Sequence, residues 1–384
     1  MKELELKEEL IKLRRHIHHN PEIGLETYNT AKFVYEYLEK IGYKNIKYVV
    51  NKAGVLCYLD NNKEETILLR TDIDALPIKE QYECEYKSKN DYMHACGHDA
   101  HCSMMLIASK MIYEIKDELN YNVLFVFQPA EEGPLPGGAL KVIPEIEQKN
   151  IIACFACHVT NDLESGKIGI KRAEAFSAPD LFEGSITGKG CHAAKPEEGC
   201  NPLYPMGEVA LAFNEENKHY PNDNVVISIT HIDGGRAKNV IPDKVFFEGT
   251  ARSFKEETRH ELEKNLTNIT ESIAAKYGAK GHFDFLYAYD PVYNEPCLVD
   301  YIKSIAPKAD LEFVELEKPT KVGEDFSFYR RLAPACMTWF GVYNKKNKRE
   351  GLHSPSFTLD EDALINGAKL HTAIVKNFKK EYIK

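Results

Sequence analysis

One nine-residue segment concentrates groups that bind metal ions. It holds Cys96, His98 and His101, together with His94 and Asp99. Cys96 and His98 are two residues apart and cannot share a helix face, whereas His98 and His101, three apart, can. We therefore expect a loop that enters a helix near Asp99. The density of thiol and imidazole groups favours a metal site.

A second chemical signal is the pair Glu131 and Glu132, which follows the apolar run 123–127. Two adjacent carboxylates repel each other. The pair becomes favourable if one ligates a cation while the other handles a proton on a water bound there. A solvated acidic turn is the alternative, and the nearby Cys/His segment favours the catalytic interpretation.

Two further histidines stand at the ends of segments that the same site could use. His158 follows the apolar run 151–157, and His353 lies in a turn-like segment near the end of the sequence. The candidate metal ligands are then Cys96, His98, Glu132, His158 and His353. Five protein groups exceed what one open catalytic zinc needs, so we expect two divalent ions that share a bridging ligand and a water. Thiolate and imidazole favour zinc, with manganese, cobalt or nickel as alternatives.

Asp72 and Asp74 end another apolar run, 66–69. We expect both carboxylates, Asp72 and Asp74, to lie behind the ligands, where they orient a ligand imidazole or stabilise the strand end. The alternative is an aspartate that serves only a turn or a helix cap.

The elements that must position these groups are strands of one sheet. Apolar runs at 66–69, 123–127, 151–157 and 336–342 alternate with amphipathic helical stretches such as 104–115. This order predicts an α/β fold with a mixed, mostly parallel sheet sandwiched by helices. Ligands of such sheets bind beyond the carboxyl ends of the strands, which is where the chemical groups fall.

The middle of the chain has a different character. Expected strands at 181–187, 224–232, 244–252 and 282–289 and helices at 202–213 and 256–277 give the order β-α-β-β-α-β. That order is typical of a ferredoxin-like α+β domain. We therefore predict a catalytic, metal-binding domain formed by residues 1–177 and 291–384, with an inserted domain at 178–290.

Composition limits the partners and the compartment. The chain has 384 residues and a net charge of −10, with no basic patch that would bind nucleic acid. Its first twenty residues form an amphipathic pattern without the apolar core of an export signal, and no apolar run is long enough for a bilayer. Ten scattered cysteines indicate reduced thiols. A cytoplasmic protein that binds neither nucleic acid nor membrane is expected.

Ten motifs, in order along nearly the whole chain, resemble the M20 metallopeptidases. The similarity is to their amidohydrolase branch, which includes aminoacylase-like enzymes, hippurate hydrolase, indole-acetyl amino acid hydrolase and N-acetyldiaminopimelate deacetylase. The motifs lie at residues 14–24, 70–77, 93–101, 127–133, 158–159, 188–194, 234–242, 249–252, 323–326 and 352–353. The resemblance implies a metal-dependent exopeptidase-like fold with an inserted lid through which subunits form a homodimer.

The resemblance also implies roles for individual residues. It makes the five candidate ligands metal-binding and Glu131 the general base and acid. It brings His192 of the lid to a neighbouring subunit's site to support the oxyanion, while Asn239 and Arg252 hold the substrate's carboxylate. A guanidinium suits that task because its fork binds a carboxylate with two hydrogen bonds.

The predicted reaction is hydrolysis of the amide bond of a small N-acyl amino acid, by a metal-activated water that Glu131 deprotonates. A di- or tripeptidase on the same scaffold is an alternative. A non-catalytic, metal-dependent binding dimer is another, although such a protein has no use for Glu131. The acyl group and the amino acid stay open at this level.

Overall fold

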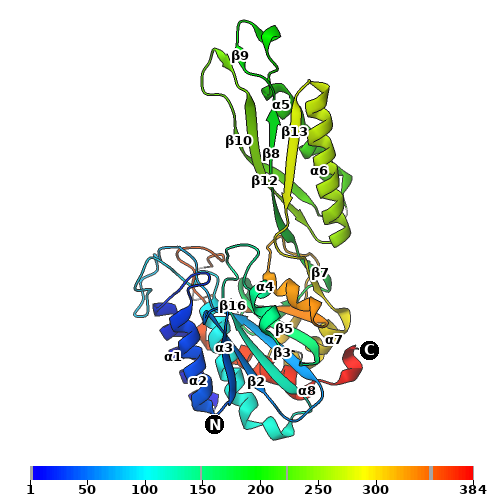
Figure 1. Cartoon of the computed structure of the whole chain (residues 1–384). Helices are drawn as coiled ribbons and strands as arrows, with labels where there is room; N and C mark the ends of the chain where they lie inside the picture. Colours follow the sequence, from blue (N-terminus) through cyan, green and yellow to red (C-terminus); the bar gives the residue numbers. More distant parts are fainter. Residues whose placement is uncertain (1–2, 148, 222–223, 346–348, 384) are drawn as a thin grey trace. The chain divides into compact units, whose positions relative to one another are not determined.

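The computed structural model describes residues 3–147, 149–221, 224–345 and 349–383, so the extreme ends of the expected catalytic domain lie outside the described residues. The chain forms two compact units (Figure 1). The larger contains Met1–Ala173, Tyr293–Lys318 and Asp325–Lys384, and the smaller contains Glu174–Val292 and Pro319–Glu324. Each unit has its own buried apolar cluster.

The larger unit is built on an eight-stranded sheet in the order β1-β2-β4-β3-β5-β16-β6-β15. The four strands β4, β3, β5 and β16 at its centre run parallel. The strands are β1 (Asn45–Val49), β2 (Gly54–Leu59), β3 (Thr66–Asp72), β4 (Asn122–Gln128), β5 (Ile151–Glu164), β6 (Lys167–Ile170), β15 (Glu312–Glu315) and β16 (Ala335–Tyr343).

Helices cover this sheet because its central strands are apolar on both faces. Ile67 and Leu69 of β3 join the main core, while Leu68 between them is equally buried on the other face. Helix α3 packs on β3 and β5, α7 packs on β16, and the short helix η6 lies against β5 and β16. The helices are α1 (Glu3–His19), α2 (Tyr28–Ile41), α3 (His98–Glu114), α4 (Ala139–Val142), α7 (Pro296–Ile305), α8 (Leu364–Asn377) and η6 (Asp325–Arg331).

The smaller unit is an antiparallel sheet with the strand order β10-β12-β8-β13. Its elements follow the predicted β-α-β-β-α-β sequence: β8 (Ala178–Thr187), α5 (Leu203–Glu216), β10 (Val226–Asp233), β12 (Lys244–Ser253), α6 (Glu256–Lys276) and β13 (Lys280–Leu286). Burial alternates strictly along β12, so one face of the sheet packs against its helices. The predicted fold class, a mixed α/β sheet with an inserted α+β domain, is confirmed.

Two details differ from the sequence-based expectation. The strand that carries His158 does not stop at Cys157 but continues to Glu164, because β16 pairs with it beyond His158. The segment 319–324 belongs to the smaller unit, since Ser177 donates its backbone N–H to Thr320 and its hydroxyl to the carbonyl of Lys321. Such pairing between distant segments leaves no local signal in the sequence.

None of the described helices has both the length and the apolar character to cross a membrane.

Candidate metal centre and active site

Two loops and a helix start bring the Cys/His segment to the sheet edge. Gly97 has φ +85° and precedes α3, and a Cβ there would lie 2.3 Å from a methyl carbon of Val159. Only glycine therefore fits the turn that places Cys96 before the helix and His98 at its first residue. The backbone N–H of His353 donates to the carbonyl of Ala95 at 2.9 Å, which fixes the late loop beside this turn.

The Cys96 sulfur is the centre of the cluster. It lies 3.4 Å from Nε2 of His158 and 3.2 Å from Nε2 of His353. The latter nitrogen also lies 3.2 Å from Oε1 of Glu132. Potential ligand atoms of Cys96, His98 and His158 converge within 4.8 Å of one another, and so do those of Cys96, Glu132 and His353. Cys96 is therefore common to two adjacent sets of donors.

Hydrogen bonds present the buried imidazoles in the form that binds metals. Nδ1 of His98 lies 2.9 Å from the carbonyl of Asp74, and Nδ1 of His158 lies 2.8 Å from the carbonyl of Val159. Because a carbonyl only accepts, Nδ1 carries the proton in each ring and Nε2 faces the cluster. Nε2 of His98 is buried without a hydrogen-bond partner. A metal ion bound to this nitrogen would take the place of the missing hydrogen bond.

The charges of the cluster also favour the binding of a cation. Burial opposes a charge on His98, but the carboxylates of Asp72 and Asp74 raise its pKa to about 10. Burial, reinforced by Glu132 and Glu131, raises the pKa of the Cys96 thiol well above its usual range. Burial holds the pKa of His158 well below its usual range, which keeps that ring neutral. Divalent ions would balance the carboxylates and allow the thiol to ionise, so the donor set fits them.

Asp74 holds the two glutamates in place. Its carboxylate oxygens accept the backbone N–H groups of Glu131 at 3.1 Å and Glu132 at 3.0 Å. Ala130, just before them, has φ +58°, a strained conformation for a residue with a side chain. Oε2 of Glu131 lies 3.9 Å from Nε2 of His98. The Glu131 side chain thus borders the metal donors from a fixed backbone.

Asp72 stands behind the donors, but its close partner is not one of the candidate ligands. Its Oδ1 accepts from Nδ1 of His101 at 2.6 Å, whereas Nδ1 of His98 is 3.8 Å away. Its other oxygen accepts from Arg70 at 2.7 Å. Sequence reasoning assigned no role to Arg70, although an arginine that directly follows a buried apolar run within one strand was the available signal.

His192 and Asn239 come together in the smaller unit. His192 is the last residue of β9 (Cys191–His192), and Asn239 directly precedes β11 (Val240–Ile241), which pairs with β9 in a two-stranded ribbon. Ala193 donates its backbone N–H to the carbonyl of Asn239 at 3.0 Å. Both side chains are exposed. The N–H of Ala194 donates to Nδ1 of His192 at 3.0 Å, so in the neutral ring the proton lies on Nε2, which is free to donate.

Arg252 lies elsewhere in the same unit. It is near the carboxyl end of β12, whereas the ribbon adjoins the other end of that strand, and Figure 1 shows β9 beyond that end of the sheet. The eight residue-to-residue steps from Lys244 to Arg252 span roughly 25 Å in an extended strand. One Nη atom of Arg252 is buried without a hydrogen-bond partner. The structure does not bring Arg252 to His192 and Asn239.

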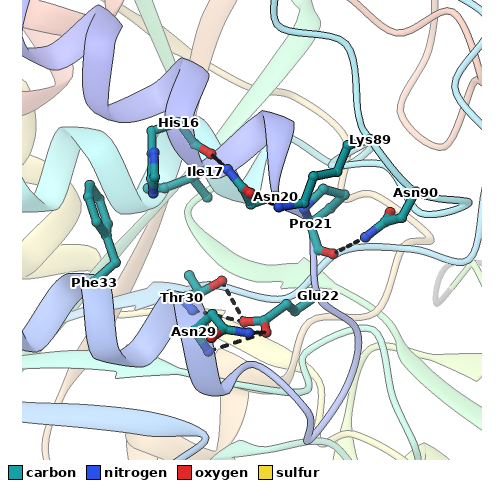
Figure 2. A pocket seen from close by; sticks show the side chains of 10 residues that line it. All are labelled: His16, Ile17, Asn20, Pro21, Glu22, Asn29, Thr30, Phe33, Lys89 and Asn90. Carbon is teal, nitrogen blue, oxygen red and sulfur yellow. Dashed lines mark hydrogen bonds between the residues drawn. The ribbon is translucent and has the colours of Figure 1, made fainter.

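A cavity of about 370 Å³ lies apart from the metal donors, between α1 and α2 (Figure 2). Its carboxylate and side-chain amides are already paired: the Glu22 carboxylate, for example, accepts from the backbone N–H groups of Asn29 and Thr30. Asn90 donates to the carbonyl of Pro21. These bonds cap α2 and tie it to the neighbouring loop, so the cavity shows no donor set for chemistry.

The chain belongs to peptidase family M20/M25/M40, whose model matches residues 68–377. This membership, together with the two converging donor sets, identifies the protein as a metal-dependent amide hydrolase.

Individual relatives agree with this membership. The chain is 35% identical over 381 residues to the Arabidopsis thaliana protein named IAA-amino acid hydrolase ILR1-like 4, with 96% of this chain and 85% of the relative covered. It is 34% identical over 367 residues to N-acetyl-L-cysteine deacetylase of Bacillus subtilis, covering 94% and 86%. Among solved structures, the YXEP protein of Bacillus subtilis, described as a dinuclear metal-binding peptidase of the M20 family, superposes with a TM-score of 0.85. It is 31% identical, with 98% of this chain and 100% of that chain covered.

Proposed function

We propose that the protein hydrolyses N-acyl amino acids to a carboxylic acid and a free amino acid, using two divalent metal ions. The observation that carries the proposal is the convergence of two donor sets on Cys96, with Glu131 beside them. The names of two relatives, an IAA-amino acid hydrolase and an N-acetyl-L-cysteine deacetylase, describe amides of this kind.

Each donor set would hold one ion. Cys96, His98 and His158 form one set, and Cys96, Glu132 and His353 form the other, with the thiolate shared. Two ions in one site agree with the description of the YXEP protein as a dinuclear metal-binding peptidase. The thiolate and imidazoles favour zinc, with manganese, cobalt or nickel as alternatives.

When bound, the ions would polarise the acyl carbonyl and lower the pKa of the attacking water. Glu131 accepts the proton of that water and then delivers it to the departing amine nitrogen, so one carboxylate serves as base and acid. The role suits Glu131 because its side chain is buried and its backbone is fixed by Asp74. Nε2–H of His192 would donate to the oxyanion.

The spacing within the smaller unit supports a dimer. Asn239 precedes the start of β12 and Arg252 lies near its end, roughly 25 Å from Lys244, so the binding of one carboxylate by both residues favours their coming from two copies. We therefore propose a homodimer, formed through the smaller unit acting as a lid, in which His192 and Asn239 enter the neighbouring subunit's site. Arg252 would then bind the substrate in its own subunit.

We also propose a cytoplasmic location. Free thiols, of which the structure describes ten, persist in a reducing compartment.

The test is a substrate screen with the metal-loaded protein. Acetyl, benzoyl and indole-acetyl conjugates of varied amino acids, including diaminopimelate, are compared with di- and tripeptides by assay of the released amine. We expect turnover of acyl conjugates. Hydrolysis of peptides alone would instead establish a peptidase, and metal binding without any hydrolysis would establish a binding dimer.

A further inference from the structure

A buried arginine of the central sheet links the metal centre to a distant part of the chain. Arg70 is 1% exposed and lies on β3. Its guanidinium donates to Oδ2 of Asp72 at 2.7 Å, to Oδ1 of Asp325 at 2.6 Å and to Oε1 of Gln128 at 3.1 Å. One side chain therefore joins β3, β4 and η6 behind the site.

On one side, Asp325 forms hydrogen bonds that hold the loop after Glu131 and Glu132. Its Oδ2 accepts the backbone N–H of Ala139 at 3.0 Å and lies 2.7 Å from Nε2 of Gln128, which also donates to it. A Cβ on Gly137 would lie 2.5 Å from the same oxygen, so the backbone passes directly over the carboxylate. Asp325 thus anchors both ends of the segment 129–138, which contains Glu131 and Glu132.

On the other side, the bonds reach a metal-ligand candidate. Asp72 accepts from Nδ1 of His101, whose Nε2 accepts the backbone N–H of Val159 at 2.8 Å. The carbonyl of Val159 in turn accepts from Nδ1 of His158. The orientation of His158 therefore depends on a continuous series of buried hydrogen bonds that begins at Arg70.

We propose that Arg70 and Asp325 are positioning residues that jointly set the geometry of the catalytic glutamates and of His158. The inference rests on the proposed function. Arg70 reaches the site through other groups, while Asp325 also has a carboxylate oxygen within 4.8 Å of one of Glu131. Neither residue belongs to the proposed ligand set. Asp325 is also the first residue of the larger unit after Pro319–Glu324 of the smaller one, so the anchor stands where the chain returns from the inserted unit.

The experiment compares Asp325→Asn, Arg70→Gln and the double variant with wild type. Zinc affinity is measured by competition with a chelator, and the ligand geometry by the absorption bands of the cobalt-loaded protein. Kinetic constants are measured with whichever acyl amino acid the wild type hydrolyses. The matched control is Tyr301→Phe, which removes a buried hydrogen bond of 2.6 Å to the carbonyl of Ile374, between α7 and α8.

We expect either single variant to weaken zinc binding about 10- to 100-fold and to alter the cobalt bands, as loss of groups behind metal ligands does. We expect kcat to fall while KM stays close to the wild-type value, because neither residue touches substrate. Tyr301→Phe should lower the melting temperature without changing zinc affinity or the cobalt bands.

The double variant keeps the test valid if a single variant fails to fold, because it removes both charges of the buried pair together. The zinc affinity of the double variant should equal that of the single variant that binds zinc less tightly, since the two residues act as one unit. Wild-type zinc affinity and unchanged cobalt bands in the folded variants would overturn the proposal. A wild type without turnover would contradict the proposed function, while the metal measurements would still decide the positioning role.

Discussion

The metal donors of the larger unit and the candidate substrate groups of the smaller unit are organised in opposite ways. Cys96, His98 and His158 are 6%, 1% and 5% exposed, and of the five proposed ligands His353 alone is exposed, with half of its side chain accessible. In the smaller unit, His192 and Asn239 are exposed on a two-stranded ribbon, and Arg252 lies at the far end of a ten-residue strand. One set is preassembled within a single unit, whereas the other is dispersed.

The difference follows from what each set must do. Groups that hold metal ions must be desolvated and fixed, because the electrostatic stabilisation of a transition state is strongest where water is excluded. Groups that hold a substrate must allow it to enter and leave. In the proposed homodimer, an exposed ribbon that completes the site only on assembly would meet that need.

Loss of the shared donor should have the largest effect. Cys96→Ala removes a ligand from both sets, so we expect metal content to fall from two ions per subunit and turnover to fall to background. Metal analysis and an amine-release assay measure this. A variant that retains both ions and normal turnover would contradict the shared role of Cys96. Treatment of wild type with a chelator, followed by readdition of zinc, is the matched control.

Replacing the proposed proton carrier should separate chemistry from metal binding. We expect Glu131→Gln to lower kcat about 10²- to 10⁴-fold, the usual range for a general acid and base. Metal content should stay at the wild-type value, because Glu131 is not among the five proposed ligands. Near-normal kcat would rule out Glu131 as the base.

Replacing the ribbon histidine tests the dispersed set. We expect His192→Ala to lower kcat about 10²- to 10³-fold, as loss of one oxyanion donor does, with normal metal content. If His192 acts across a dimer, mixing and refolding equal amounts of His192→Ala and Glu131→Gln subunits should restore about a quarter of wild-type activity. No recovery in mixed dimers would place His192 in its own subunit's site.

Arg252→Lys should have a smaller effect, confined to substrate binding. Losing one charge-assisted hydrogen bond costs about 1.5–3 kcal/mol, so we expect KM to rise about 10- to 100-fold while kcat changes little. A substrate whose carboxylate is replaced by a carboxamide provides the control. Its KM should be high in wild type and unchanged in the variant.

The smallest effect concerns the stability of the metal-free protein. Although burial opposes its charge, the carboxylates of Asp72 and Asp74 raise the folded-state pKa of His98 from the ordinary value of 6.5 to about 10. Protonation therefore stabilises the fold fully below about pH 6.5, and this contribution is lost as the pH rises towards 10. We expect the melting temperature of the metal-free wild type to fall further between pH 6.5 and pH 9.5 than that of metal-free His98→Asn. If the melting temperatures of both proteins fall equally with pH, the proton on His98 does not contribute to stability.

Much of the fold could be predicted because its signals are local. Apolar runs located the central strands, and the β-α-β-β-α-β order of the inserted unit followed from periodicity. The same runs led to the expectation that the chemical groups gather at one edge, and five of them do converge. The strand end at Cys157 was wrong because pairing with β16 extends β5 past His158.

Other features depend on contacts between residues far apart in the sequence. Arg70 and Asp325, 255 positions apart, form a buried ion pair at 2.6 Å. The sequence around one of these residues does not indicate the other as its partner. The direct partner of Asp72 proved to be His101 and not a proposed ligand. The assignment of segment 319–324 to the smaller unit likewise depends on its pairing with residues near 176.

The sequence by itself determined the types of the reactive groups, the order of the elements that carry them and the family to which the chain is similar. Only the tertiary structure decided that Cys96 is common to two donor sets and that Arg252 lies far from Asn239. It also decided that a buried arginine connects both halves of the site. The physical reason is that spacing along a chain limits geometry over a few residues, whereas strand pairing and the burial of charges fix the distances between segments.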